Sequence, residues 1–528
     1  MHAGNGRDTL VQRSYKIREN ARHDFGFRRV FLSTIAVTCS FLACTVSGLA
    51  ASGKERVDIL IAGGTVITMD PARRIIENGA LAIVRDRIVA VGTTSELQAR
   101  FKARQLIDAQ RKIVMPGLID GHGHAGHAIL KSFGAETAAE RLYAHGSTPD
   151  FWRADAALAG LERLKAGVTT SVNLLGGGSD VYRVDDPKYA DAYLAAIRDI
   201  GVRWFLGVGP RPGPYPSAFT DWTGNSPHDI QVSFDRQLEV SDTLIRKWNN
   251  AAEGRIKMAV VFPTISPKPE LSGAALDQIK REARAARDLS KRLGVFFLQD
   301  GHMRGTVKFA NDELGLLGPD VILSHAIELT DEEIELLAKT GTRVSHNPSA
   351  IFSIMGRNPT TELIDAGAIV MLGSDGAAPD RSYDMFRHMF QATRYHRRHF
   401  RDPSVLPAGK VLEMATIDAA RAIGMEKEIG SLENGKKADI ILIDWFKPRL
   451  MPMNMPVHRV VYFANGEDVA TVLVDGRVLM RDRKILSVDE SAALSFAQRE
   501  ADLGFKRAGL ENSTALPEGF WGKTRLAP

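Results

Sequence analysis

The chain has 528 residues, of which 44% are hydrophobic and 25% charged, and these values are typical of a globular protein with a large core. Seven of its 68 basic and three of its 63 acidic residues lie in residues 1–53, which leaves 61 and 60 for the remainder. The body of the chain is therefore nearly neutral despite the net charge of +5, and we find no basic run that indicates nucleic-acid binding.

Residues 1–53 read as an export segment. A basic region ends in Arg28-Arg29-Val30-Phe31-Leu32, which resembles a twin-arginine signal, and an apolar stretch follows over residues 30–51. We therefore expect export to the periplasm, and the alternative is a retained membrane anchor, because the stretch is long enough to span a bilayer. Both cysteines, Cys39 and Cys44, lie in this stretch, so a mature chain would contain no disulfide and no thiolate ligand.

Short strands flanked by turn residues are expected at both ends of the mature chain. Residues 54–111 contain three apolar runs, at 57–61, 80–84 and 87–92. Residues 426–490 contain three more, at 440–443, 469–474 and 477–480, and the last two flank the hairpin signal Asp475-Gly476. We predict that both ends build one small β-sandwich domain, and that residues 491–528 form a polar helix and a tail.

Residues 112–425 alternate between apolar strands and helices, which predicts an α/β fold with a closed (β/α)8 TIM barrel. The helix expected over 330–339 opens with a capping box of Thr330 and Glu333. The eight predicted strands are Lys112–Leu118, Thr169–Leu175, Arg203–Val208, Lys257–Phe262, Val295–Gln299, Val321–Ser324, Arg343–Ser345 and Ile369–Leu372.

Histidines and aspartates follow several of these strands. His122 and His124 are one residue apart, so an extended strand would present both imidazoles on one face, as half of a metal site. Strand five is followed by Asp300 and His302, strand six by His325 and strand eight by Asp375. Since the carboxyl ends of barrel strands meet at one mouth, the pattern predicts a metal centre there.

At this point the sequence resembles the amidohydrolase superfamily, in the branch of cytosine, guanine and S-adenosylhomocysteine deaminases and triazine hydrolases. The resemblance implies one divalent metal ion, zinc in first place and iron as the alternative, with His122 and His124 as ligands. It implies that Asp375 is a ligand and the general base, and that His325 polarises water or substrate. The matching strings are MPGLIDGHGH, LLGPDVILSHAIELTDEE, VSHNPSA, LGSDGAAPD and GSLENGKKADIILID with VLVDGRVL.

Strand five departs from this branch, which usually shows His-x-x-Glu there with the Glu as proton shuttle. No Glu follows His302 at that spacing. We predict His302 as the metal ligand on chemical grounds. Asp300 is the next candidate, and it is also a candidate acid or substrate contact. A two-metal site is disfavoured, because Lys257 stands at the start of strand four and a bridging lysine would stand at its end.

The predicted function is hydrolysis of a C–N bond in a cyclic or amide small molecule, of deaminase or amide-hydrolase type. Because the strand-five Glu is absent, a second possible function is that of a carbamate hydrolase or dehalogenase that releases no ammonia. A third is that of a non-catalytic exported barrel that binds a ligand. His127 and Tyr215, the latter in a proline-rich loop, are candidate substrate contacts. The resemblance also implies a homo-oligomer. Membrane contact is expected only if the N-terminal segment is retained.

Overall fold

The structure is a computed structural model that describes residues 53–132, 141–175, 183–224, 226–516, 519–522 and 524–525. The chain divides into two units, residues 1–53 and 54–528, and the helices and strands given below belong to the second. The predicted export segment lies outside the described residues. Within the described ranges, no helix combines the length and the apolar character that crossing a membrane requires.

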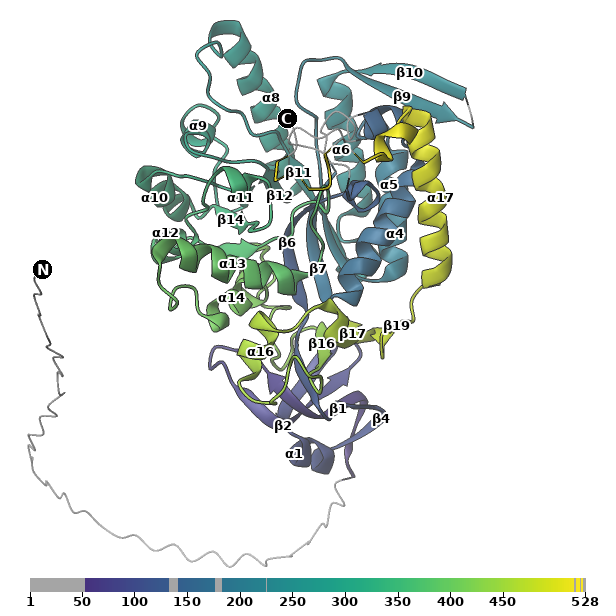
Figure 1. The fold of residues 1–528 in the computed structure, drawn as a ribbon, viewed down its shortest axis with the longest axis vertical. Coiled ribbons are helices and arrows are strands. Elements are labelled where there is room, and N and C mark those ends of the chain that lie inside the picture. Colours follow the sequence, from purple (N-terminus) through teal and green to yellow (C-terminus); the bar gives the residue numbers. More distant parts are fainter. Residues whose placement is uncertain are drawn as a thin grey trace, which may run out of the picture. The chain divides into compact units, whose positions relative to one another are not determined.

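Eight parallel strands form the barrel, in the order in which they occur along the chain (Figure 1). The last strand returns to the first, where the Asp375 N–H donates to the His122 carbonyl at 2.8 Å. The predicted (β/α)8 architecture is therefore confirmed. The strands are β6 (Leu118–His124), β7 (Val168–Leu174), β8 (Arg203–Val208), β11 (Ile256–Val261), β12 (Phe296–Gln299), β13 (Val321–Ser324), β14 (Arg343–His346) and β15 (Val370–Leu372).

Helices between and after these strands cover the outside of the barrel (Figure 1). Their ends follow local chemistry: Thr330 and Glu333 form the predicted capping box of α10, and Thr148 caps α4 through the Phe151 N–H. The helices are α2 (His127–Leu130), α4 (Pro149–Lys165), α5 (Pro187–Ile200), α6 (Phe234–Trp248), α7 (Ala251–Gly254), α8 (Gly273–Leu293), α9 (Thr306–Asp312), α10 (Asp331–Thr340), α11 (Phe352–Met355), α12 (Thr360–Asp365), α13 (Met385–Phe400), α14 (Ala408–Met414) and α15 (Ile417–Ala422), with the π-helical turn η1 (Leu142–Gly146).

The prediction that Lys112–Leu118 forms one barrel strand is wrong. The chain breaks at Gly117, and β5 (Lys112–Pro116) pairs with strands outside the barrel. Gly117 donates its N–H to the Asp439 carbonyl at 3.0 Å, and an added Cβ there would lie 2.1 Å from Thr169 Oγ1. Barrel strand one therefore begins at Leu118.

Nine strands from both chain ends form a second sheet. Its centre is β5, which pairs in parallel with β1 and antiparallel with β16, and β4 lies on the other half of β1. Apolar side chains of both ends share one core, as in Ile61, Leu81 and Leu442. Both chain ends thus build the small β domain, as predicted. Its strands are β1 (Glu55–Ile67), β2 (Ile75–Val84), β3 (Arg87–Thr93), β4 (Phe101–Asp108), β5, β16 (Ile440–Asp444), β17 (Val469–Val474), β18 (Arg477–Arg481) and β19 (Lys484–Ile485), with helix α1 (Thr94–Arg100).

This sheet adjoins the amino ends of the barrel strands. Arg203, the first residue of β8, is buried and reaches Asp475 Oδ1 at 2.6 Å and Asp439 Oδ2 at 3.2 Å. The barrel mouth, where the carboxyl ends of the strands meet, is therefore at the opposite end from the sheet. The remaining elements are the hairpin β9 (Ser217–Thr223) and β10 (Ser226–Val232), and α16 (Pro456–Tyr462), α17 (Glu490–Ala508), η2 (Gly466–Asp468) and η3 (Glu511–Thr514).

Candidate metal centre

The His-x-His pair ends β6, and both imidazoles are buried. The residue between them, Gly123, must be a glycine for steric reasons. A Cβ at this position would lie 2.5 Å from Arg163 Nη2 and 2.9 Å from Asn173 Oδ1, so any side chain would displace the groups beneath the strand. The alternation of the strand then turns His122 and His124 to the same side, as the sequence predicts.

Three further buried side chains, those of Asp300, His325 and Asp375, converge on this pair. Asp300 Oδ1 lies 3.2 Å from His122 Nε2 and 3.1 Å from His325 Nε2, while Asp300 Oδ2 lies 3.2 Å from His124 Nε2. Asp375 Oδ1 lies 3.2 Å from His124 Nε2 and 3.8 Å from His122 Nε2. The described residues contain two overlapping groups with metal-ligand spacing, His122 with His124 and Asp300, and His122 with His325 and Asp375.

These separations fit a coordinated ion. Donors held about 2.0–2.1 Å from a tetrahedral metal lie roughly 3.3 Å from one another. The Nε2 atom of His122 is buried and makes no hydrogen bond, although Asp300 Oδ1 is only 3.2 Å away. The two donors thus point to a common position rather than at each other. Three imidazoles and two carboxylates are ligands that suit zinc, iron or manganese.

Charge pairing within the cluster is strong. Burial alone would raise the pKa of Asp300, but the imidazoles of His122 and His124 outweigh it and hold that pKa well below its ordinary value. Burial would likewise raise the pKa of Asp375, and Arg381 together with His124 keeps it well below the ordinary range. Conversely, Asp300 and Asp375 overcome burial and raise the pKa of His124 well above its ordinary value. The cluster is thus built to hold positive charge between its carboxylates.

Two of the five residues have a strained backbone. His325 and Asp375 adopt φ values of 67° and 64°, a left-handed region that costs non-glycine residues about 1–3 kcal/mol. Neighbouring groups hold them there. Asn358 Nδ2 donates to the His325 carbonyl at 2.5 Å, and Phe352 stacks on the His325 ring with a centroid distance of 4.5 Å. Such strain is typical of residues whose position serves a site.

The structure brings Asp300, the second candidate, into the cluster and leaves His302, the predicted strand-five ligand, outside both groups with metal-ligand spacing. Gly301, with a φ of 83°, turns the chain between them. The His302 ring is fully buried and lies 3.0 Å from Thr306 Oγ1 through Nδ1, and burial lowers its pKa to about 3. Its Nδ1 thus bonds within the loop after β12, while its Nε2 is buried without a hydrogen-bond partner.

The two candidate substrate contacts differ. His127 begins α2, and its ring stacks on His124 with a centroid distance of 5.0 Å, which places it beside the centre. Tyr215 instead bonds through its hydroxyl to the Arg211 carbonyl and packs edge-on against Phe234. In the described part of the chain, no contact joins Tyr215 to the metal cluster.

Sequence reasoning missed the groups that support the cluster. Asp120 lies in the same string as the histidines, fully buried, and accepts hydrogen bonds from Ser374 N at 2.8 Å and Ser374 Oγ at 2.7 Å. Arg163 of α4 donates to it from Nε at 2.9 Å. Arg381 Nη2 lies 3.7 Å from Asp375 Oδ2. The Asp120 carboxylate lies two residues before His122 in the sequence, and it could have indicated that a charged group supports the cluster.

Comparison with known proteins agrees with this geometry. The amidohydrolase family model matches residues 113–479. A second model, for an imidazolonepropionase-like composite domain of bacteria, matches residues 79–101.

Curated relatives align with more than four fifths of the chain. The 5'-deoxyadenosine deaminase of Methanosarcina mazei is 30% identical over 454 residues, 84% of this chain and 98% of that protein. The 5-methylthioadenosine/S-adenosylhomocysteine deaminase 1 of Syntrophus aciditrophicus is 30% identical over 466 residues, 85% of this chain and 98% of that protein.

Solved structures share the fold. An adenosine deaminase from Xanthomonas campestris with bound zinc superposes with a TM-score of 0.74 at 23% identity, over 86% of this chain and all of that one. A triazine hydrolase variant superposes with a TM-score of 0.70 at 23% identity, over 84% of this chain and 99% of that one.

Proposed function

Because the chain belongs to the amidohydrolase family, we propose that it deaminates the adenine base of a nucleoside that lacks a free 5'-hydroxyl group. Hydrolysis of a C–N bond in a metal-dependent manner is the activity of the family and of its deaminase relatives. The observation that carries the proposal is the buried cluster of His122, His124, His325, Asp300 and Asp375 at the barrel mouth. The adenine nucleoside class is supported by the full-length relatives.

We propose that a divalent ion, zinc in first place with iron as the alternative, binds to four residues of this cluster: His122, His124, Asp300 and Asp375. When bound, the ion supplies Lewis-acid activation of water near neutral pH. In hydrolytic deamination, the water oxygen bonds to the ring carbon that carries the amino group and the C–N bond breaks. Ammonia leaves with one of the two protons of the water, and the other proton ends on the adjacent ring nitrogen.

Asp375 is placed to carry that proton. Its Oδ1 faces His124 and accepts the Gly376 N–H at 2.6 Å, while its Oδ2 is turned to Arg381, 3.7 Å away. The Asp375 carboxylate takes the proton from water and returns it to the leaving nitrogen. His325, fixed by Phe352 and Asn358, orients the attacking water and donates to the oxygen as charge develops on it.

The test is ammonia release from adenosine, 5'-deoxyadenosine, 5'-methylthioadenosine and S-adenosylhomocysteine by the metal-loaded protein. We expect turnover on the 5'-modified nucleosides and a loss of about 10²–10⁴-fold in kcat for Asp375→Asn. A chain that binds these nucleosides without converting them, and whose Asp375→Asn variant binds equally well, would be a ligand-binding barrel and would refute the proposal.

The ligand assignment has its own test in the metal content of purified variants. Asp300→Asn should lower metal affinity at least tenfold, since loss of supporting partners alone costs 10–100-fold. His302→Asn is the matched control, because its ring bonds Thr306 rather than the cluster. Equal metal loss in both variants would contradict the assignment of Asp300.

A second reaction is favoured by one observation. The residue three positions after Asp300 is Met303, so strand five supplies no shuttling carboxylate there. A leaving group that departs as an anion, such as a halide, needs no proton. Assay of chloride release from chlorinated triazines beside ammonia release from nucleosides separates the two reactions directly.

The cellular setting is also a proposal. The basic and apolar character of residues 1–53 supports export to the periplasm, and detection of the mature chain in a periplasmic extract tests it. A homo-oligomer is proposed from the family resemblance, and the mass of the purified protein in solution decides it.

A further inference from the structure

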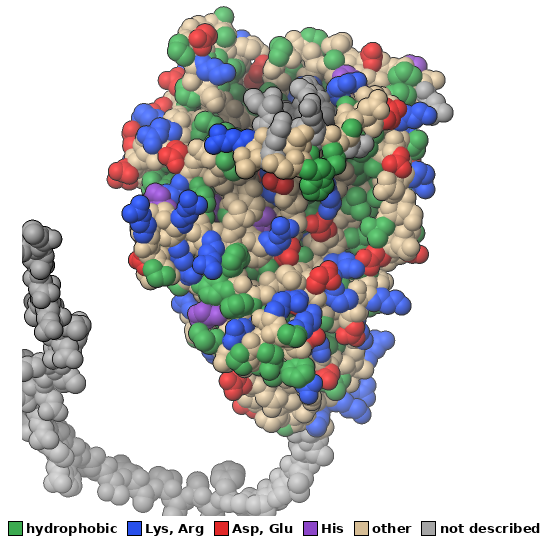
Figure 2. All heavy atoms as spheres, in the orientation of Figure 1, with side chains coloured by type: hydrophobic (Ala, Val, Ile, Leu, Met, Phe, Trp, Pro, Cys, Tyr) green, Lys and Arg blue, Asp and Glu red, His purple; other side chains and the backbone are tan. Residues whose placement is uncertain are grey.

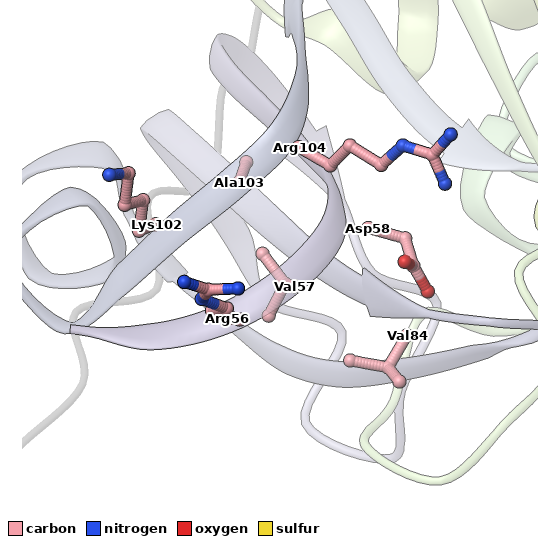
Figure 3. Close-up of a pocket in the computed structure, with 7 residues that line it drawn as sticks. All are labelled: Arg56, Val57, Asp58, Val84, Lys102, Ala103 and Arg104. Carbon is pink, nitrogen blue, oxygen red and sulfur yellow. The ribbon is translucent and has the colours of Figure 1, made fainter.

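A shallow pocket lies on the nine-stranded sheet, far from the metal centre. It has a volume of about 380 Å³ and is lined by residues of β1, β2 and β4 (Figure 3). Three of its lining side chains are cations: Arg56 from β1, and Lys102 and Arg104 from β4. Figure 3 shows Arg56 and Lys102 at one end of the pocket, with Arg104 and Asp58 at the other.

Strand pairing brings these cations together. Arg56 and Lys102 are direct partners in the parallel register of β1 and β4, and Lys102 and Arg104 are two residues apart, so all three share one face. All three side chains are exposed. We call Arg56, Lys102 and Arg104 the basic face. Figure 2 shows Lys and Arg side chains gathered over this part of the sheet, at the lower right.

The pocket is lined by three cations and one acid, so its net charge is positive. Asp58, the acid in the pocket, accepts the Arg85 N–H at 2.7 Å and is thereby engaged in a backbone turn. Nearby, Glu55 is paired with Arg100 at 3.0 Å. Across the described ranges, no ion pair or hydrogen bond joins the three cations of the basic face to an acid. The surface is therefore complementary to an external anion.

The position of the basic face along the chain indicates which kind of anion it binds. The apolar stretch of residues 30–51 is joined to β1 by a few residues, and Arg56 follows Ala51 by five positions. Five extended residues span at most about 18 Å. In a chain that keeps this stretch in a bilayer, the start of β1 lies within that distance of the lipid headgroups. Basic residues next to a membrane-inserted segment are typical of surfaces that bind anionic lipids.

We propose that the basic face docks the protein on an anionic phospholipid membrane. The sheet adjoins the amino ends of the barrel strands, as the buried contacts of Arg203 with Asp439 and Asp475 show. A molecule docked through this sheet turns its barrel mouth away from the lipid. The metal centre then stays open to small substrates in the aqueous phase while the protein is held at the membrane.

The test uses residues 54–528, which form a compact unit without the N-terminal segment. Binding is measured by co-sedimentation with vesicles of phosphatidylcholine alone and with vesicles containing one third phosphatidylglycerol. The test variant carries Arg56→Glu, Lys102→Glu and Arg104→Glu. The matched control carries the same change of charge in exposed cations on or before α8: Lys268→Glu, Arg284→Glu and Lys291→Glu.

Each basic residue near an anionic surface contributes about fivefold in partitioning, so we expect the test variant to bind about a hundredfold more weakly than the parent chain. The control should lose less than about fivefold, and 0.5 M salt should release the parent chain. Ammonia release should be equal in all three proteins. Equal losses in test and control variants, or no preference for the anionic vesicles, would overturn the proposal and leave the cations as protection of an open strand edge.

Discussion

The buried charge pair beneath the metal centre provides a sharp test of what stabilises the barrel. Arg163 donates from Nε to Asp120 at 2.9 Å and from Nη2 to Asn173 at 3.1 Å, and its guanidinium lies 3.5 Å from the centre of the Tyr383 ring. Both charged side chains are almost wholly excluded from solvent, at 1% and 0% exposure. The pair connects α4 with β6 and β7.

Arg163→Met keeps most of the side-chain volume and removes the charge. The Asp120 carboxylate then stays buried without a counter-ion, which costs about 3–5 kcal/mol of unfolding free energy. The double variant with Asp120→Asn removes both charges and should recover a large part of that loss. An exposed pair serves as the control: Arg236 and Glu239 are 47% and 67% exposed, so Arg236→Met should cost no more than about 1 kcal/mol.

The assay is equilibrium unfolding in urea, followed by tryptophan fluorescence, on metal-free protein so that ligand binding does not contribute. The midpoint shift of Arg163→Met is compared with those of the double variant and the exposed control. If Arg163→Met costs no more than Arg236→Met, or if the double variant costs the sum of its two single changes, the buried pair is not the stabilising element inferred from the structure.

Two further predictions concern groups around His127. A Cβ on Gly376 would lie 2.2 Å from His127 Nδ1, so Gly376→Ala should displace the ring and lower kcat/KM at least tenfold. The control is Gly409→Ala, which has no atom within 4 Å of the added Cβ; it should leave kcat/KM unchanged and stabilise helix α14 by about 0.5–1 kcal/mol. Steady-state kinetics and urea unfolding of the two variants test both expectations. Burial raises the pKa of Asp155 from 3.8 to about 6, so between pH 4 and 7 the unfolded chain ionises first and the folded state loses about 3 kcal/mol. Asp155→Asn cannot ionise, so its stability relative to the parent chain should shift by that amount in its favour over this range in urea titrations, and a difference that does not change with pH would contradict the assignment.

Most of the barrel could be predicted because each parallel strand is a short apolar run that is buried on both sides. Arg203–Val208 and Val321–Ser324 match the structure to the residue. The His-x-His pair was equally readable, since the alternation of a strand places both rings on one face. The break between two strands at Gly117 could not be predicted, because it is caused by contacts with Asp439 and Thr169, which are distant in sequence.

The arrangement of the strand-five residues was not readable for the same reason. Whether Asp300 or His302 reaches the cluster depends on the left-handed turn at Gly301 and on the hydroxyl of Thr306, neither of which changes the strand pattern. The basic face was also hidden in the sequence. Arg56 is more than 40 positions from Lys102 and Arg104 along the chain and meets them only through the pairing of β1 with β4.

The central position of β5 in the terminal sheet has a consequence for synthesis on the ribosome. Met115 pairs with Ile441, so β5 must wait for more than 300 further residues before its second edge is covered. At about 5–20 residues per second, the wait is on the order of 20–60 s, during which the strand exposes open N–H and C=O groups. A nascent chain that stalls before β16 therefore carries an unpaired strand edge that can pair with another chain. Binding by a chaperone or degradation by a protease would prevent its aggregation.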